Sequence, residues 1–504
     1  MKRANIIRDY LTELIRVGSI LVLGMVQLRI LLEYLGDDGY GVWVLVPEVI
    51  FWVTLAEPVI RSSLNRFVAE AYGRRAIRET SQILATLATI IAPIAIVSAL
   101  TGVIFSPEII NSFDSFPEDL KPQGIFLLRM FCISTVFTAV TGLSSFLLHA
   151  ISRIDVTNYL FIPLIWARSI SYIVIAVTGF GLVGLAWAQV ILAMFTSVAM
   201  CVIALRTVQG KGIISWRFFR PGRVPGLRNY LLFSAIARVG DSLRSRTTLI
   251  LFGWFAGLET VAVLGIVEKI KQPAHMAMVS IADVAFPRLS KSVSREKDFT
   301  GMVSSFGTIL GVFSICISLG MVLLAKPFIL LWAPPEDALQ VLVPIIQLSA
   351  LVTLLEAGRM MFGRSLRAQN KVHLIAYGQL VEGVLSFVLS IFLGYAMGVL
   401  GLLLARAIVS GVYLLVFVPL CFGKAAKIKA PLYYTSCYIR PLLAGCVGAV
   451  PLFLICQYSS LSTWGTFLGL GIPGLAVLCC VVGLFGTSHE IRAEIIQRTR
   501  TIFR

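Results

Sequence analysis

The feature that most constrains the fold is a succession of apolar stretches, each about 20 residues long, which is enough for an α-helix to cross roughly 30 Å of hydrocarbon. Fourteen such stretches can be marked, at residues 13–35, 40–62, 80–105, 124–149, 158–178, 182–205, 229–253, 259–283, 301–325, 340–361, 373–393, 398–421, 437–458 and 465–486. The chain is 58% hydrophobic and only 14% charged, whereas soluble domains are about a quarter charged. The sequence therefore predicts an all-α integral membrane protein with about 14 transmembrane helices.

The placement of Lys and Arg predicts the orientation of these helices, because short cytoplasmic loops carry an excess of both residues. With the N-terminus placed in the cytoplasm, 28 of them fall in inner segments and only Lys121 and Lys326 in outer loops. We therefore expect both termini in the cytoplasm. The first 20 residues lack a small-residue cleavage site, so we expect a retained first helix. The formal net charge of +17 is mostly a topology signal, and we expect no nucleic-acid partner.

An internal repeat predicts the organisation of the helices. Arg29–Ile50 aligns without gaps on Leu249–Ile270, at an offset of 220 residues, with Glu48 opposite Glu268. The offset covers six predicted helices, and an even number preserves orientation, so the repeats would be parallel lobes around a central cavity. The predicted parts are an N-lobe of helices 1–6 (1–207), a basic cytoplasmic linker (208–228), a C-lobe of helices 7–12 (229–421), and helices 13–14 with a basic cytoplasmic tail (422–504).

Charged residues inside the predicted helices are the best indication of function, because a central Arg costs at least ~2.5 kcal/mol and usually faces protein or a water-filled cavity. Guanidinium groups bind phosphate bidentately and keep their proton, so cavity arginines favour an anionic substrate. The candidate substrate-binding residues are Arg16, Arg29, Arg238, Arg244, Arg246 and Arg359. The candidate ion-coupling residues are Glu57, Asp241, Glu356 and Glu382.

Simpler interpretations remain open for several of these residues. Asp241 with Arg244, and Glu356 with Arg359, are three residues apart and can equally form intrahelical ion pairs. For Glu57 the alternative interpretation, a boundary acid near the cytoplasmic end of helix 2, is slightly favoured over ion coupling. A basic residue close to a predicted helix end, such as Lys271, is interpreted as extending its charge to the lipid headgroups.

Several kinds of chemistry have no motif in the chain. There is no GxxxxGK[ST] loop for ATP, and no GxSxG, GxGxxG, HExxH or EF-hand pattern. The nine cysteines lack CxxC spacing and the four histidines form no metal-binding pair. We therefore predict no catalytic residue, no metal site, no disulfide and no cofactor. Transport would be driven by a proton or sodium gradient, or by the substrate's own fall in free energy.

The segment Leu31–Arg75 has a family resemblance. It contains Leu35, Gly36, Tyr40, Gly41 and Trp43 in the turn between helices 1 and 2, then Glu57, then a basic segment from Arg66 to Arg78. This pattern resembles the bacterial polysaccharide flippases of the multidrug/oligosaccharidyl-lipid/polysaccharide exporter superfamily. Weaker similarity lies at 284–292 and 398–410. The family often has Asp followed by Gly where this chain has Glu57 and Pro58, so the resemblance assigns that acid no role.

The resemblance implies a two-lobed, alternating-access flippase in the bacterial inner membrane. It would translocate a polyprenyl-pyrophosphate-linked oligosaccharide for O-antigen, capsule or exopolysaccharide synthesis, and the intramembrane arginines would bind the pyrophosphate. Expected partners are this substrate and membrane lipids, with polysaccharide polymerase and assembly proteins as further candidates. The alternatives are a cation-coupled multidrug or small-molecule antiporter of the same superfamily, a membrane glycosyltransferase or polymerase, and a non-transporting scaffold.

Overall fold

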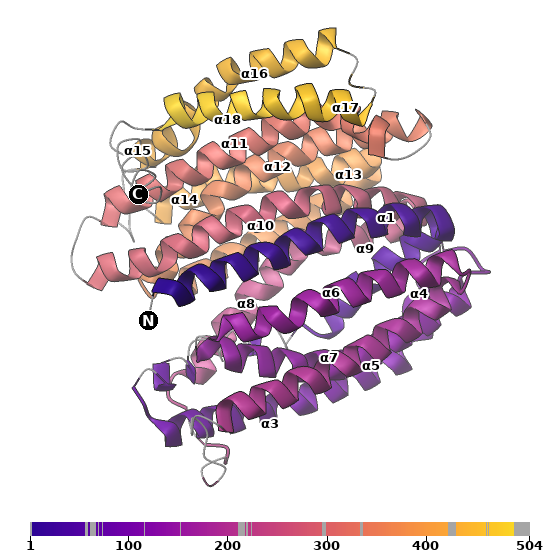
Figure 1. Ribbon diagram of the computed structural model, residues 1–504, viewed down its shortest axis with the longest axis vertical. Helices are drawn as coiled ribbons and strands as arrows, with labels where there is room; N and C mark the ends of the chain where they lie inside the picture. The colour runs from indigo at the N-terminus through magenta and orange to yellow at the C-terminus, as the bar shows by residue number, and fades with distance from the viewer. Residues whose placement is uncertain are drawn as a thin grey trace. The chain divides into compact units, whose positions relative to one another are not determined.

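The computed structural model describes residues 3–55, 59–60, 67–68, 70–72, 74–114, 116–151, 153–209, 217, 220–222, 224–294, 299–332, 336–421, 430–459, 461 and 463–487. Every regular element in these ranges is a helix (Figure 1). In chain order the longer ones are α1 (Arg3–Val53), α3 (Ile77–Ile104), α5 (Lys121–Ala150), α6 (Ile154–Val177), α7 (Gly181–Gln209), α8 (Leu227–Ser245), α9 (Thr247–Phe255), α10 (Leu258–Ser294), α11 (Phe299–Trp332), α12 (Glu336–Ala368), α13 (Val372–Val412), α16 (Arg440–Tyr458) and α18 (Ile472–Gly486). Short elements join them: α4 (Ser106–Asn111), α14 (Val418–Cys421), α15 (Ala430–Tyr434), α17 (Trp464–Thr466), and π-helical turns at Tyr413–Phe417, Thr435–Ile439 and Phe467–Gly471.

Ten helical segments of the described chain are long and apolar enough to cross a membrane. Two of them, Ile15–Val53 and Val372–Cys421, have 39 and 50 residues, about twice the length that one crossing needs. Each has a glycine with non-helical backbone angles inside it, Gly36 in α1 and Gly398 in α13. Each therefore contains two of the predicted transmembrane helices, joined at a sharp kink.

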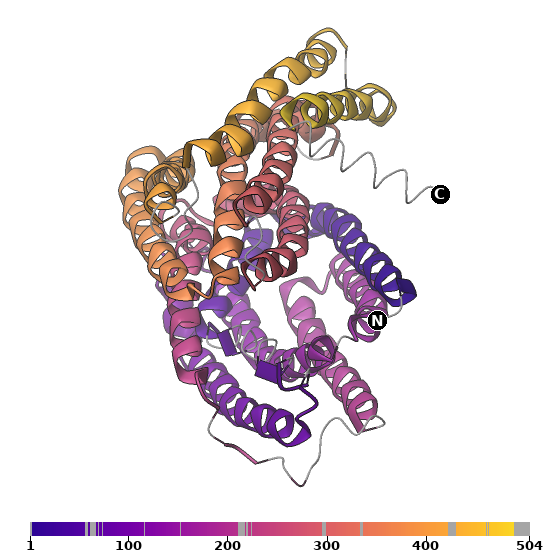
Figure 2. The same cartoon turned by 90° about the vertical axis from the view of Figure 1, so that its left-hand side faces the viewer.

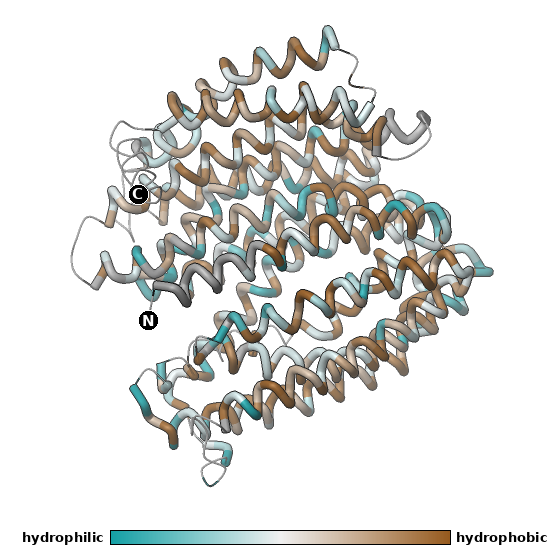
Figure 3. The backbone as a smooth tube through the Cα atoms, in the orientation of Figure 1, coloured by the Kyte–Doolittle hydropathy of each residue, from teal (hydrophilic) through white to brown (hydrophobic). Residues whose placement is uncertain are grey.

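The two remaining predicted helices are the ones that carry many charges. Residues 229–253 form α8 and α9, which are interrupted at Arg246, and residues 259–283 lie in α10. With these, all fourteen predicted stretches coincide with helical segments in the described part of the chain. The all-helical, multi-pass membrane architecture is confirmed. Figure 3 shows hydrophobic positions along most of the helices.

Contacts divide the chain into two compact units. The first unit is Met1–Ser242 with Arg246–Ile266, and the second is Leu243–Ser245 with Val267–Arg504. This division crosses between units inside α8 and α10, whereas the predicted lobes rest on the repeat and its linker. The predicted lobe boundaries, with the linker at 208–228, stay a prediction.

The first unit is built on helices that pack along one another. α5 runs along α7 and α3, and α6 runs along α1 (Figure 1). Leu87, Leu148 and Met200 form part of a buried apolar core there. In the second unit, Met278, Leu310 and Phe362 belong to a core that joins α10, α11 and α12.

The C-terminal helices α16 and α18 lie side by side against α11 (Figures 1 and 2). Leu452 and Leu478 pack there with Ile315, and all three side chains are buried. Most other residues of these two helices that face away from this contact are exposed and apolar, as expected for a lipid-facing surface.

The predicted repeat has a structural counterpart inside the first unit. Gly36 has φ +71° and Gly257, between α9 and α10, has φ +83°. Both angles lie in the left-handed region that favours glycine, and the two turns fall within one residue of the 220-residue offset. Each repeat segment is therefore a helix, a tight glycine turn and a second helix.

The two repeat segments also pack closely against each other. A Cβ atom on Gly41 would collide with the Leu258 carbonyl group, and one on Gly265 would lie 2.8 Å from a Val44 methyl carbon. Both positions lack room for any side chain larger than hydrogen. The glycine that follows Tyr40 is thus explained by close helix packing.

Candidate functional site

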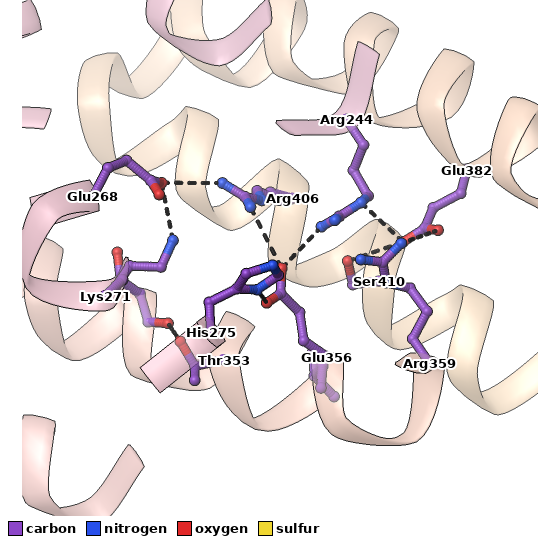
Figure 4. A network of polar contacts seen from close by, with 12 residues as sticks. Arg244, Glu268, Lys271, His275, Thr353, Glu356, Arg359, Glu382, Arg406 and Ser410 are labelled. Atoms are coloured by element: carbon purple, nitrogen blue, oxygen red, sulfur yellow. Dashed lines mark hydrogen bonds and ion pairs between the residues drawn. The ribbon is translucent and has the colours of Figure 1, made fainter. Parts of the chain in front are cut away.

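Charged side chains from four helices meet in the second unit (Figure 4). We call this set the charge network; it consists of Arg244 from the end of α8, Glu268, Lys271 and His275 from α10, Glu356 and Arg359 from α12, and Glu382, Arg406 and Ser410 from α13. Spacings of three and four residues place neighbours on one face of a helix, which explains the sets on α10 and α12. The kink at Gly398 folds α13 back, so that Glu382 and Ser410 meet although 28 residues separate them.

One half of the network centres on the Arg406 guanidinium. Its Nη1 lies 3.3 Å from Oε1 of Glu268, and its Nη2 lies 3.5 Å from Oε1 of Glu356. The Lys271 Nζ lies 2.9 Å from the same Glu268 oxygen. One guanidinium thus bridges carboxylates from α10 and α12.

The other half centres on Arg244. Its Nη1 lies 3.3 Å from Oε1 of Glu356, and its Nε lies 3.7 Å from Oε1 of Glu382. Nη1 of Arg359 lies 3.9 Å from Oε2 of Glu382, and the Ser410 hydroxyl donates to Oε1 of Glu382 at 3.2 Å. Arg244 therefore ties the end of α8 to α12 and α13.

The charges alternate in sign along this line, which runs Lys271, Glu268, Arg406, Glu356, Arg244, Glu382, Arg359. Each of the three carboxylates has a cationic side chain on both sides. Arg244, Glu356 and Glu382 are only 3%, 4% and 2% exposed. Burying a charge is tolerated only when it is paired, and removing one member of a buried pair costs about 3–5 kcal/mol.

His275 is attached to the middle of the line. Its Nδ1 lies 3.2 Å from Oε2 of Glu356, and half of its side chain is exposed. The Glu356 carboxylate lies between two guanidinium groups and is therefore ionised, so it only accepts hydrogen bonds. Nδ1 consequently carries the proton of the neutral imidazole, and Nε2 is left with a lone pair.

A smaller charged cluster lies in the first unit. Nη1 of Arg246 is 2.7 Å from Oε1 of Glu48, and Nη1 of Arg238 is 3.8 Å from Oδ2 of Asp241. Both guanidinium groups lie 4.8 Å from the centre of the Phe51 ring, a favourable cation–π geometry. The Arg238 and Arg246 side chains are 36% and 43% exposed.

The structure separates the residues that the sequence singled out. Arg244, Arg359, Glu356 and Glu382 belong to the charge network, whereas Arg238, Asp241 and Arg246 belong to the first-unit cluster. Arg16 and Arg29 lie on α1, where Arg16 is half-buried and Arg29 is exposed. Glu57 lies outside the described residues. The roles of these residues, substrate binding for the arginines and ion coupling for the acids, stay predictions.

The sequence alone could not identify the ion pairs that join different helices. Glu356 pairs with Arg244 and Arg406, which lie on other helices. Asp241 pairs within its own helix, with Arg238. The interpretation of Lys271 as a headgroup-seeking residue is wrong, because its side chain is buried and contacts Glu268.

Five members of the charge network were not among the predicted site residues: Glu268, His275, Lys271, Arg406 and Ser410. The signal that could have found the first two is their placement with Lys271 at spacings of three and four residues, which puts them on one face of α10. Arg406 stands out only as an Arg inside an apolar run. Nothing in the sequence connects it with α10, 138 residues earlier.

No family model and no curated protein matches the sequence. Solved structures do match. A lipid II flippase, MurJ, in an inward closed conformation aligns with a TM-score of 0.72 and 14% identity over 94% of this chain and 98% of that chain. An inward-facing multidrug resistance MATE family transporter of the MOP superfamily aligns with a TM-score of 0.69 and 11% identity, over 82% of this chain and 99% of that chain.

The chain has the fold of these transporters. A further MOP superfamily transporter, from Pyrococcus furiosus, has a binding pocket described as having reversed polarity; it aligns with a TM-score of 0.64 and 13% identity over 83% of this chain and 95% of that chain. This shared fold accounts for the multi-pass architecture. The solved neighbours are membrane transporters and flippases.

Proposed function

We propose that the protein is a flippase that moves a lipid-pyrophosphate-linked oligosaccharide from the cytoplasmic to the outer face of the bacterial inner membrane. The observation that carries the proposal is the extent of its similarity to a lipid II flippase, which covers 94% of this chain. The multidrug transporter covers 82%, although nearly all of that chain is matched. The flippase match therefore leaves a smaller part of this chain without a structural counterpart.

The charge inside the membrane helices supports the same substrate class. A pyrophosphate headgroup is anionic, and a guanidinium fork binds it without giving up a proton. Arg29, Arg238 and Arg246 retain exposed surface and are the better candidates for direct contact. Arg244 and Arg359 are held among carboxylates and would act by keeping the helices in place. The protein performs no covalent chemistry in this proposal.

The alternative is a cation-coupled multidrug or small-molecule antiporter. It is favoured by the similarity to solved MATE multidrug transporters. The two functions differ in the charge of the substrate. An antiporter for cationic drugs predicts drug hypersensitivity after gene deletion, with normal surface polysaccharide.

Deletion of the gene in its host tests the proposal. We expect loss of surface polysaccharide and accumulation of complete oligosaccharide-lipid on the cytoplasmic side of the inner membrane. A lipid that reaches the outer face but lacks one sugar would instead identify an enzyme. Normal polysaccharide with normal lipid-linked intermediates would overturn the proposal.

Two substitutions probe the arginines in the complemented deletion strain. Arg29→Ala and Arg244→Ala are expected to stop transport without removing the protein from the membrane, the first by loss of a phosphate contact and the second by loss of the tie between α8, α12 and α13. Arg74→Ala is the control, because Arg74 is 58% exposed and pairs only with exposed acids in the described structure. Normal surface polysaccharide in both test variants would reject the assignment.

A further inference from the structure

The carboxylates of the charge network already have cations beside them. Glu268 lies between Lys271 and Arg406, Glu356 between Arg406 and Arg244, and Glu382 between Arg244 and Arg359. A metal cation coming from solution would need a carboxylate oxygen and would meet resident positive charge at each one. The network is therefore poorly suited to take up sodium.

His275 is different from the other charged members. It has no fixed charge, and imidazole is the side chain whose charge changes between about pH 5 and 8. The groups that face it are Glu356 of α12 and, through that carboxylate, Arg244 of α8 and Arg406 of α13. On its own helix Lys271 and Glu268 lie one and two turns away. Half of the His275 side chain is exposed, whereas that of Glu356 beside it is buried.

We propose that His275 is the proton-binding residue that couples transport to a proton gradient. The inference rests on the proposed transport function and adds the ion and the residue that binds it. The incoming proton binds at Nε2, because Nδ1 already donates to Glu356. No other covalent bond forms or breaks, and the proton later leaves from the same nitrogen toward the opposite side of the membrane.

Protonation changes the balance around Glu356. The line holds four cationic and three anionic side chains, and an imidazolium raises the cations to five. The charged His275 then competes with Arg244 and Arg406 for the same carboxylate, which weakens the links from α12 to α8 and α13. Loss of the proton restores them. A proton thereby shifts the balance between two arrangements of these helices.

The first experiment reads the proton directly and needs no substrate. Full-length protein labelled with ¹⁵N-histidine is reconstituted in phosphatidylethanolamine/phosphatidylglycerol vesicles, and the signals of its four histidines are followed by solid-state NMR. The signal absent from His275→Gln is assigned to His275. We expect it to change from the neutral to the charged form as the pH is lowered. A His275 signal that stays in one form throughout the pH series overturns the proposal.

The second experiment reads coupling. Vesicles that also contain lipid-linked oligosaccharide purified from the host are assayed for exposure of its sugars to periodate, with and without an imposed pH gradient. The ratio of the two rates is expected to exceed one for the wild type and for His373→Gln, a control near the start of α13. It is expected to fall to one in His275→Gln.

The outcomes separate the two proposals. A gradient response in His275→Gln equal to that of the wild type, or a wild type that translocates without any gradient response, overturns the role of His275. A wild type that exposes no sugar under any condition contradicts the flippase function itself. In that case the histidine titration still decides whether His275 is a proton site.

Discussion

At the scale of single residues, the charge network shows how a membrane protein keeps many ionisable groups buried. Its cations and carboxylates alternate, so every buried carboxylate is neutralised twice and every internal arginine is shared. Glu356 holds the central place, with Arg244, Arg406 and His275 around it. The network belongs to the second unit alone, and it spans the end of α8 together with α10, α12 and α13.

Removing the central charge tests this arrangement. Glu356→Gln keeps the shape of the side chain but leaves Arg244 and Arg406 with one carboxylate each in the line, and we expect a loss of about 3–5 kcal/mol in stability. Thermal unfolding in detergent measures it as a lowered midpoint. The control is Glu79→Gln, which breaks an exposed pair with Arg74 and should cost at most ~1 kcal/mol. Equal midpoints for the two variants would show that the buried line contributes little.

At the scale of elements, glycines decide where one helix ends and the next begins. α1 and α13 each continue through a residue with positive φ, at Gly36 and Gly398. Without these turns each would be a single helix far longer than the membrane is thick. The turn at Gly398 also returns the chain so that Glu382 and Ser410 become neighbours.

The backbone at Gly36 gives a direct test. It has φ +71° and ψ 175°, a region essentially reserved for glycine, and nothing lies within 4 Å of an added Cβ. Gly36→Ala should therefore destabilise the protein by about 1–3 kcal/mol through backbone strain alone. Gly24→Ala in the same helix is the matched control, since it too has open space and should be neutral or slightly stabilising. Folded yield and unfolding midpoint of the two variants check the difference, and indistinguishable behaviour would contradict the strain.

At the scale of the whole molecule, the placement of basic residues predicts how the chain lies in the membrane. Only Lys121 and Lys326 fall in the predicted outer loops. Both termini are expected in the cytoplasm, which requires an even number of crossings. The described chain has fourteen helical segments that coincide with the predicted stretches, and fourteen is an even number.

Reporter fusions measure this orientation. Alkaline phosphatase fused after Asp114, in a predicted outer loop, should be active, and the same enzyme fused after Arg153 or Arg504 should be inactive. Green fluorescent protein at the last two positions should fluoresce. Active phosphatase at Arg504 would place the C-terminus outside and contradict the even count.

The sequence by itself determined the properties that depend on short stretches of chain. Hydropathy over about 20 residues is a local quantity, so the number and position of the helices, the all-α membrane class and the repeat around Gly36 and Gly257 could be predicted. Even the weakest pair of stretches, at 229–253 and 259–283, coincides with α8, α9 and α10.

Only the tertiary structure decided which charges meet. Arg244 and Glu356 are 112 residues apart, and Arg406 and Glu268 are 138 apart, so their pairing depends on how each helix is rotated and packed. Lys271 shows the limit most clearly: near a predicted helix end it is expected at the headgroups, yet it is buried beside Glu268. The physical reason is that a charge in a membrane is stabilised by its partner, and the partner is supplied by another helix.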